Sequence, residues 1–264
     1  MASQPPNGEN NRHEMQDSDG KTTQVVDVAR VMRLLDCGAI REEHGMLRWS
    51  SNYTFLVSVS DDELQTVAVY KPQRGERPLW DFPDGTLCYR EAAAHLVSDS
   101  LGWQIVPPTV LREGPRGLGS LQLYIPNNSD VNYFSLDETS AAQLMRFAAF
   151  DYIVNNADRK GGHCLLAADG HLWGIDHGLA FHSAPKLRTV VWDFAGQRVP
   201  DVLLADLERL CACMEDLQNP ARLELDKLLA DSEVNAFMAR VRRLLQRREY
   251  PRPGPGPNYP WPPV

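Results

Sequence analysis

The pattern of the sequence changes once along the chain, at Pro126. Between residues 45 and 125 the apolar side chains alternate as they do in strands, with one helical stretch at 89–100. After Pro126 they recur at helical spacing. Strands followed by helices indicate an α+β architecture of two lobes, which we place at 23–126 and 127–248. We expect a ligand site in the cleft between these lobes, because such clefts commonly bind ligands.

Periodicity and capping residues predict the individual elements. Asn219 before Pro220 is one example, since an asparagine cap followed by proline favours the start of a helix. The predicted helices cover residues 25–37, 89–100, 141–155, 202–217, 221–230 and 234–248. The predicted strands lie within 45–71, at 110–111 and 121–125, and in a short hairpin at 164–166 and 172–175.

The two ends of the chain lack such periodicity. Residues 1–22 are polar with almost no large apolar side chains, which predicts a disordered tail. Residues 249–264 are dominated by proline and glycine, which predicts an extended, disordered and solvated tail. The alternative for this second segment is docking, in which Tyr259 and Trp261 fill an aromatic groove.

Charge and composition exclude several classes of protein. The net charge of −8 lacks the basic excess with which nucleic-acid-binding proteins neutralise phosphates, so we expect no nucleic-acid partner. No apolar run reaches the roughly 18 residues of a membrane span, and the N-terminus shows no apolar signal region. The five cysteines form no Cys-x-x-Cys pair, which argues against a zinc site or a disulfide framework. We therefore expect a cytoplasmic protein with reduced thiols.

Charged residues flank the predicted hairpin on both sides. Asp158 is followed by Lys160 and His163, and Asp176 comes directly after the second strand. Phosphoryl transfer from ATP requires an aspartate that orients the acceptor, a lysine on the nucleotide and a metal held by the protein. The spacing matches the kinase pattern Asp-x-Lys-x-x-Asn, with His163 where asparagine is usual. Taken singly, each aspartate also fits a turn or a helix cap.

Candidates for nucleotide binding precede these loops. Lys71 closes the strand Val-Ala-Val-Tyr-Lys, as a kinase lysine that reaches the phosphates does, and Glu91 on the next helix would pair with it. A solvated strand end and an exposed first-turn glutamate are the simpler interpretations of these two residues. In place of a Gly-rich phosphate loop the chain has Ser50, Ser51 and Asn52. They would offer hydroxyls and backbone N–H groups to phosphate oxygens, or form a polar hairpin turn.

Two segments, Asn-Asn-Ala-Asp-Arg-Lys-Gly-Gly-His (155–163) and Gly-Ile-Asp-His-Gly-Leu-Ala-Phe (174–181), resemble the phosphatidylinositol 3-/4-kinase-like family, in particular its compact bacterial members. The resemblance implies a bilobal protein-kinase-like fold. Its first lobe would hold a small antiparallel sheet with one key helix, and its second lobe would be mainly helical. The resemblance also implies that Asp158 orients the acceptor hydroxyl, Lys160 meets the γ-phosphate and Asp176 holds magnesium.

The same resemblance implies how ATP and its metal would be bound. Leu123, Tyr124 and Ile125 would form the hinge whose backbone reads adenine, with Gln122 just before it. ATP with magnesium or manganese would be the cofactor, and His163 is a candidate metal ligand beside the aspartate. Neutral imidazole suits manganese or zinc better than magnesium, so His163 bears on both metal preference and activity.

These residues predict an ATP-dependent kinase that transfers the γ-phosphoryl group to a hydroxyl of a protein or small molecule, with protein Ser/Thr or autophosphorylation favoured. Three alternatives stay open: a phosphatidylinositol lipid kinase, a pseudokinase or nucleotide-binding scaffold with little turnover, and a transferase that moves another part of the nucleotide. A transition-metal site of Asp176, His177 and His182 is a further alternative, although its spacing matches no standard zinc motif.

The last predicted helix carries a row of arginines. Such a row could contact anionic lipid at a membrane surface, so peripheral membrane contact is an alternative. A solvated face stabilised by the helix dipole is the favoured interpretation. The arginines are Arg240, Arg242, Arg243, Arg247 and Arg248.

Overall fold

The structure is a computed structural model of the chain. It describes residues 15–16, 22–23, 27–46 and 52–264. The predicted N-terminal tail therefore falls mostly outside the described residues, and within it Met15–Gln16 (β1) pairs antiparallel with Thr22–Thr23 (β2). Two residues of the predicted phosphate loop, Ser50 and Ser51, also lie outside the described residues.

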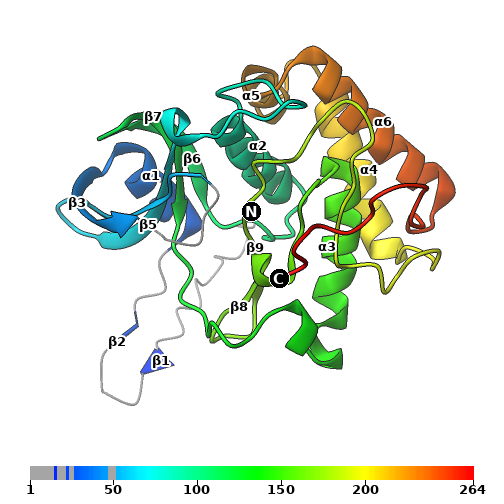
Figure 1. Cartoon of the computed structure of the whole chain (residues 1–264), viewed down its shortest axis with the longest axis horizontal. Helices are drawn as coiled ribbons and strands as arrows, with labels where there is room; N and C mark the ends of the chain where they lie inside the picture. Colours follow the sequence, from blue (N-terminus) through cyan, green and yellow to red (C-terminus); the bar gives the residue numbers. More distant parts are fainter. Residues whose placement is uncertain (1–14, 17–21, 24–26, 47–51) are drawn as a thin grey trace, which may run out of the picture.

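The first lobe is built on a five-stranded antiparallel sheet with the strand order β3-β4-β5-β7-β6 (Figure 1). Buried side chains alternate along β4, which gives the sheet one apolar face for its core. Lys71 lies near the end of the central strand β5, opposite Ser120 of β7. The strands are β3 (Ala39–Met46), β4 (Phe55–Ser60), β5 (Gln65–Pro72), β6 (Thr109–Gly114) and β7 (Gly117–Leu123).

Helix α1 (Val28–Cys37) covers the apolar face of this sheet. Its first turn is capped by Asp27, whose side chain accepts a hydrogen bond from the amide of Ala29 at 3.3 Å, so the helix starts later than predicted. Leu34 and Leu35 are fully buried against the strands. A short 3-10 helix, η1 (Gln73–Gly75), follows β5 and leads toward the second lobe.

Helix α2 (Leu87–Ser100) connects the two lobes. Its N-terminus is held by Glu76, whose carboxylate accepts hydrogen bonds from the amides of Leu87 and Cys88 at 3.0 and 2.8 Å. Its apolar face, however, packs into the core of the helical lobe rather than into the core of the sheet. The predicted boundary at residue 126 therefore does not separate the two cores, because the small side chains of Ala93 and Ala94 let α2 pack closely on the second lobe.

The second lobe is mainly helical, and its core contains the fully buried rings of Phe147, Phe150 and Phe237. Figure 1 shows α3, α4 and α6 side by side on the side of the molecule away from the sheet. No helix in the described part of the chain is both long and apolar enough to cross a bilayer. The elements are η2 (Tyr133–Ser135), η3 (Glu138–Ser140), α3 (Ala141–Val154), η4 (Gly161–His163), β8 (Cys164–Leu166), β9 (Leu172–Gly174), α4 (Asp201–Glu215), α5 (Pro220–Leu228) and α6 (Asp231–Arg247).

This arrangement confirms the predicted α+β class and the two-lobed design of a small antiparallel sheet with a helical partner. The helix bounds lie close to those predicted, since capping groups and apolar periodicity act locally. The predicted hairpin also forms, with β8 and β9 paired antiparallel.

The C-terminal segment differs from the solvated tail that its composition predicts. The carbonyl of Asn258 accepts hydrogen bonds from the amide of Thr189 and the indole of Trp192, each at 3.1 Å. The carbonyl of Pro263 accepts one from the amide of Gly161 at 2.7 Å. Proline and glycine prevent regular structure here, but their free carbonyls pair with amides of neighbouring loops. Figure 1 shows the segment running from the end of α6 back toward β8 and β9.

The segment docks through its backbone and a few buried rings, not through the side chains named for an aromatic groove. Tyr250 is buried in the helical core, and its hydroxyl donates to the carbonyl of Met145 at 3.0 Å. Tyr259 and Trp261 remain 57% and 89% exposed.

Candidate functional site

A cavity of about 250 Å³ lies between the two lobes. Its walls come from β5 and its neighbouring loops, from α2, from the loop after α3 and from the loop after β9. The structure thus brings together five predicted site residues that are far apart in the sequence. They are Asn52, Lys71, Glu91, Asp158 and Asp176.

Lys71 forms two ion pairs at the centre of this cleft. Its ammonium contacts the carboxylate of Glu91 and lies 2.9 Å from Oδ1 of Asp176. Although burial alone would lower the pKa of Lys71, the carboxylates of Asp176 and Glu91 raise it above its ordinary value. In turn, the Lys71 charge holds the pKa of Asp176 well below its ordinary range. Lys71 and Asp176 are therefore both charged at neutral pH.

Glu91 also joins α2 to the loop that bears Asp176. Its second carboxylate oxygen accepts a hydrogen bond from the amide of His177 at 3.0 Å, and the residue is 2% exposed. This burial excludes the simpler interpretation of Glu91 as an exposed first-turn residue. Asp176 itself has φ 61°, a left-handed conformation that non-glycine residues seldom adopt outside functional sites. Its side chain is 46% exposed in the cleft.

Asp158 and Lys160 lie across the cleft, with 3.3 Å between Lys160 Nζ and Asp158 Oδ2. Burial raises the pKa of Asp158 to about 6, against the lowering effect of the Lys160 charge. The loop is shaped by Asn156, whose side-chain oxygen accepts a hydrogen bond from the Asp158 amide at 3.0 Å. A carboxylate with this pKa is ionised at neutral pH and can still accept a proton.

A buried ionic network supports this loop from beneath, and sequence reasoning missed it. Arg159 and Asp151 are both fully buried and form an ion pair with 3.0 Å between Arg159 Nη2 and Asp151 Oδ1. Asn156 and Thr189 each donate to the same carboxylate at 3.0 Å. Arg159 also donates to the carbonyl of Ile175, next to Asp176, at 2.9 Å. The network therefore fixes both loops relative to each other. The sequence signal that could have indicated this network is Asp151, a charged residue in the otherwise apolar end of α3.

His163 and Asp176 face each other, with 3.5 Å between His163 Nε2 and Asp176 Oδ2. Burial lowers the pKa of His163 to about 4, so the imidazole is neutral at physiological pH. A neutral imidazole and a carboxylate at this separation fit as two ligands of one divalent cation. No cluster of three His, Cys, Asp or Glu side chains that could hold a metal occurs among the described residues. Further ligands would come from phosphate oxygens and water.

The alternative metal site of Asp176 with the two following histidines is not formed. His177 is fully buried and its Nε2 lies 2.5 Å from Nη2 of Arg159. His182 instead accepts a hydrogen bond from the amide of Ala184 at 2.9 Å through its Nδ1. The two rings therefore have separate structural partners.

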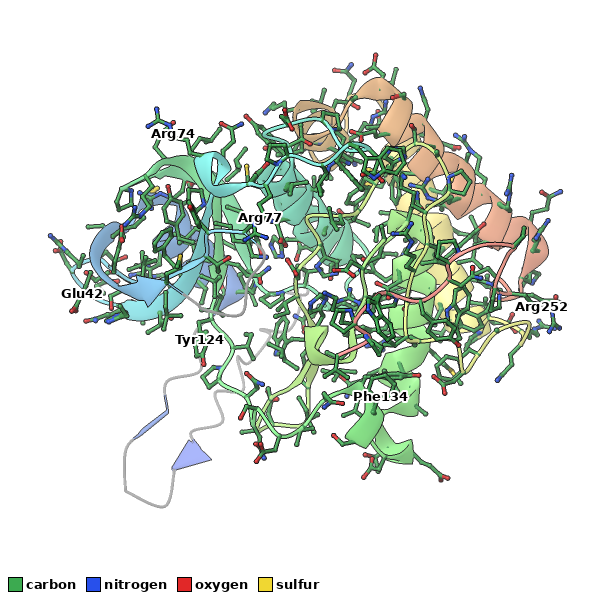
Figure 2. All side chains as sticks on the ribbon, viewed as in Figure 1. Glu42, Arg74, Arg77, Tyr124, Phe134 and Arg252 are labelled. Atoms are coloured by element: carbon green, nitrogen blue, oxygen red, sulfur yellow. The ribbon has the colours of Figure 1, made fainter. Side chains whose placement is uncertain are left out.

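Among the described residues that line this cavity, none belongs to the predicted adenine hinge. Gln122 is buried, and its amide donates to Thr109 Oγ1 at 2.8 Å within the sheet. The backbone amides of Leu123 and Tyr124 already donate to carbonyls of residues 108 and 67. Figure 2 shows Tyr124 at the lower end of the sheet, where the chain leaves for the helical lobe. The hinge residues thus lie where the chain passes from the sheet to the helical lobe. The binding of adenine by their backbone, through Ile125, stays a prediction.

Arg77 is a cleft residue that sequence reasoning missed. It lines the cavity, and its backbone amide donates to Oδ1 of Asn52 at 2.9 Å. Figure 2 shows Arg77 between the sheet and α2. Its guanidinium has no hydrogen-bond or ion-pair partner in the described part of the chain. A second cation near Lys71 suits a polyphosphate.

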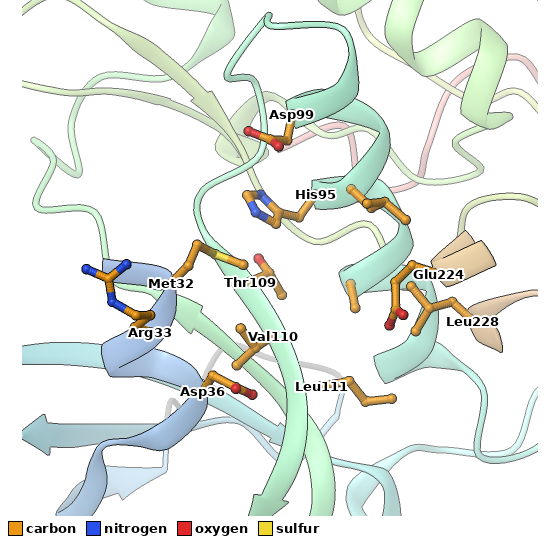
Figure 3. Close-up of a pocket in the computed structure, with 12 residues that line it drawn as sticks. Met32, Arg33, Asp36, His95, Asp99, Thr109, Val110, Leu111, Glu224 and Leu228 are labelled. Carbon is orange, nitrogen blue, oxygen red and sulfur yellow. The ribbon is translucent and has the colours of Figure 1, made fainter. Parts of the chain in front are cut away.

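A larger cavity of about 460 Å³ lies on the opposite face of α2, between α1, β6 and α5 (Figure 3). His95 and Met32 border it, and none of the predicted site residues that the structure describes does. Burial lowers the pKa of His95, which disfavours a charged ring in this wall. We therefore assign the chemistry to the smaller cleft, where the charged residues converge.

The two lobes and the charged cleft between them define a kinase-like protein. A family model for phosphatidylinositol 3- and 4-kinases matches residues 18–224 of the chain. The chain therefore belongs to the phosphatidylinositol 3- and 4-kinase family.

Individual relatives resemble the chain over different shares of its length. Protein Rv2133c of Mycobacterium tuberculosis is 38% identical over 253 residues, which cover 83% of this chain and 90% of that protein. Phosphatidylinositol 4-kinase gamma 4 of Oryza sativa subsp. japonica is 32% identical over 108 residues, which cover 34% of this chain and 19% of that protein. Among solved structures, the Helicobacter pylori proinflammatory kinase CtkA matches with a TM-score of 0.44 at 14% identity, covering 80% of this chain and 98% of that one.

Proposed function

We propose that the cleft transfers the γ-phosphoryl group of ATP to a hydroxyl group of a protein, including serine or threonine of the chain itself. The observation that carries the proposal is the double ion pair of Lys71 with Glu91 and Asp176, directly across from Asp158. In kinases a lysine of this kind binds phosphate, and its pairing with a helix glutamate belongs to the assembled active arrangement.

Cations on both sides of the cleft would receive the triphosphate. Lys71 and Arg77 lie on the sheet side, and Lys160 lies on the side of the helical lobe. In the proposed reaction, the acceptor oxygen attacks the γ-phosphorus while the bond to the β,γ-bridging oxygen breaks and ADP leaves. Asp158 orients the acceptor hydroxyl and takes its proton. Lys160 neutralises charge on the transferring group, since it contacts Asp158 and so lies at the point of transfer.

Asp176 and His163 would hold the divalent cation of this reaction, as their separation and charge states allow. A bound cation would neutralise charge on the phosphates. The imidazole ligand favours manganese over magnesium on general affinity grounds. The protein's own contribution is to keep His163 neutral by burial and Asp176 ionised by its pairing with Lys71.

Incubation of the purified protein with γ-labelled ATP tests the proposal. Magnesium and manganese should be compared, with Asp158→Ala and Asp176→Ala as matched inactive variants. A generic protein acceptor, the chain alone and phosphatidylinositol vesicles should be separate arms, so that the acceptor class is read directly. Label in the vesicle arm alone would favour the lipid-kinase alternative.

The pseudokinase alternative rests on one observation, the histidine at position 163 beside Asp176. It predicts that the chain binds ATP but transfers no label above the two alanine variants with either metal. That result would reject phosphoryl transfer and leave a nucleotide-binding module.

A further inference from the structure

The arginines at the end of α6 do not form one solvated face. Arg240 turns inward and donates to a backbone carbonyl of α3 at 2.8 Å. Arg242 and Arg248 each form an ion pair at 2.8 Å with an acidic residue of α4. Arg243 and Arg247 remain, and both are exposed. The structure therefore divides the row into three arginines with structural partners and two that have none among the described residues.

Arg243 and Arg247 line a cavity of about 440 Å³, together with Arg252 from the C-terminal segment. We call this space the arginine cavity. None of the three guanidinium groups has a hydrogen-bond or ion-pair partner among the described residues. Pro185 and Tyr250 add apolar walls. A space of this size is within the range of small-molecule sites.

The exposed side chain of Arg252 lies against the backbone of Gly196. Its guanidinium lies so close to Gly196 that a Cβ there would approach it to 2.3 Å. Gly196 has φ 75°, and its amide donates to the carbonyl of Tyr250 at 3.0 Å, which anchors the start of the C-terminal segment. Figure 2 shows Arg252 at the edge of the molecule near the end of α6. The guanidinium of Arg252 therefore lies on backbone and has no acidic partner among the described residues.

The charge of the arginine cavity selects a class of ligand. Three guanidinium groups and the single carboxylate of Glu249 leave a local charge of +2 on a chain whose net charge is −8. Unpaired like charges that share a cavity repel one another unless an anion or solvent screens them. The guanidinium fork matches phosphate oxygens in two-point hydrogen bonds. A phosphate monoester carries close to two negative charges at neutral pH and so balances this cavity.

We propose that the arginine cavity binds a phosphate monoester. No residue of its walls is shared with the cleft, so it is a second site. Its ligand would connect α6 to the C-terminal segment. The far end of that segment contacts the loop of Asp158 and Lys160 through the hydrogen bond between Gly161 and Pro263. The proposal stands independently of phosphoryl transfer, because it rests only on the three unpaired arginines and their cavity.

Titration calorimetry of the full chain tests it, with inorganic phosphate and glucose 6-phosphate as soluble probes. Sedimentation with phosphatidylcholine vesicles, with and without phosphatidic acid, tests the same chemistry on a membrane surface. Arg247→Gln and Arg252→Gln should each weaken binding about tenfold, as expected when a charge-assisted hydrogen bond is lost. Arg242→Gln and Arg248→Gln are the matched controls, since they remove the same charge from the same region but not from the cavity, and they should bind as the unchanged chain does.

Binding of the soluble probes identifies a free phosphate ester as the ligand, and binding only to vesicles with phosphatidic acid identifies a lipid headgroup. Equal weakening by the cavity and control variants would show a diffuse surface effect and overturn the site. Failure of all probes to bind the unchanged chain would also overturn it. None of these readings depends on kinase activity, so a negative result here and an inactive cleft are separate outcomes.

Discussion

At the scale of single residues, Lys71 is the most constrained charge in the cleft, because it satisfies two carboxylates at once. We predict that Lys71→Met lowers kcat/KM by about 10²- to 10³-fold, the loss typical of removing one group that stabilises transition-state charge. The variant also leaves Glu91 and Asp176 without their shared cation, so its melting temperature should fall by a few degrees. Label transfer and thermal unfolding measure the two effects.

Lys227→Met is the matched control, because Lys227 pairs with Glu224 on an exposed face of α5. Both its activity and its melting temperature should stay close to those of the unchanged chain, as exposed pairs contribute little. Similar activity losses in the two variants would contradict the role assigned to Lys71.

The pKa of Asp158 determines the acidic limb that we predict for the pH profile of kcat/KM. Burial raises its pKa to about 6, so the neutral form dominates below that pH and cannot accept the acceptor's proton. We expect kcat/KM to rise about tenfold per pH unit below pH 6 and to level off above it. Lys160→Gln should move this limb to higher pH, because the Lys160 charge lowers the pKa of Asp158, whereas Lys160→Arg keeps the charge and should leave the limb in place. A limb at the same pH in both variants would contradict the assignment.

The charged residues of the cleft could be predicted from the sequence because their types and spacing follow the pattern that phosphoryl transfer requires in kinases. Lys71, Glu91, Asp158 and Asp176 all reach one cavity. The pair Arg159 and Asp151 could not be predicted in the same way. Its function depends on complete burial, and burial of two opposite charges is decided by packing that no local pattern encodes.

At the scale of elements, the C-terminal segment supplies a hydrogen-bond acceptor, the carbonyl of Pro263, to the loop of Asp158 and Lys160. We predict that removal of residues 253–264 lowers kcat roughly tenfold and leaves KM for ATP unchanged, because small displacements of catalytic groups are costly while the walls of the cleft contain no residue of this segment. The truncated chain keeps Tyr250, whose ring is part of the helical core. Steady-state kinetics separate the two constants, and a synthetic peptide of residues 253–264 should restore part of the rate.

A single substitution separates a specific effect of the segment from a general loss of structure caused by the truncation. Asn258→Ala removes the side-chain hydrogen bonds to Gly254 and Gly256 that shape the segment, and it should lower kcat in the same direction as the truncation. Pro255→Ala changes an exposed position of the same segment and should have no effect. An unchanged kcat in both the truncation and the Asn258 variant would show that the segment only covers the surface.

Composition predicted correctly that this segment forms neither helix nor strand. It could not predict docking, because that depends on whether carbonyls such as those of Asn258 and Pro263 find amides on distant loops. The helices behaved differently, since caps such as Asn219 with Pro220 determine where a helix begins from adjacent residues alone.

At the scale of the whole molecule, α2 belongs to the sheet lobe by chain order and to the helical lobe by packing. The sequence predicted two lobes and assigned this helix to the first by its place in the chain. Its small apolar residues fit either lobe, and only the competition between the two cores decides where they pack. The consequence is that Glu91, which orients Lys71, is carried by a helix fixed to the opposite lobe.

One link in this attachment is Arg90, which is 1% exposed. It donates to the carbonyl of Ala180 at 2.7 Å and to Glu233 of α6 at 2.5 Å. We predict that Arg90→Met lowers the free energy of unfolding by about 3–5 kcal/mol, because it leaves a buried carboxylate and a carbonyl unpaired. Denaturant unfolding measures this loss.

Adding Glu233→Leu to Arg90→Met should restore part of the loss, since the double variant removes both charges instead of stranding one. The single and double variants also report on the cleft. If the attachment of α2 to the helical lobe positions Glu91, kcat should fall in Arg90→Met even at temperatures where the protein remains folded. The reason is that Glu91 then loses its fixed position relative to Lys71. A destabilised variant with unchanged kcat would show instead that the Lys71–Glu91 pair is maintained by the sheet alone.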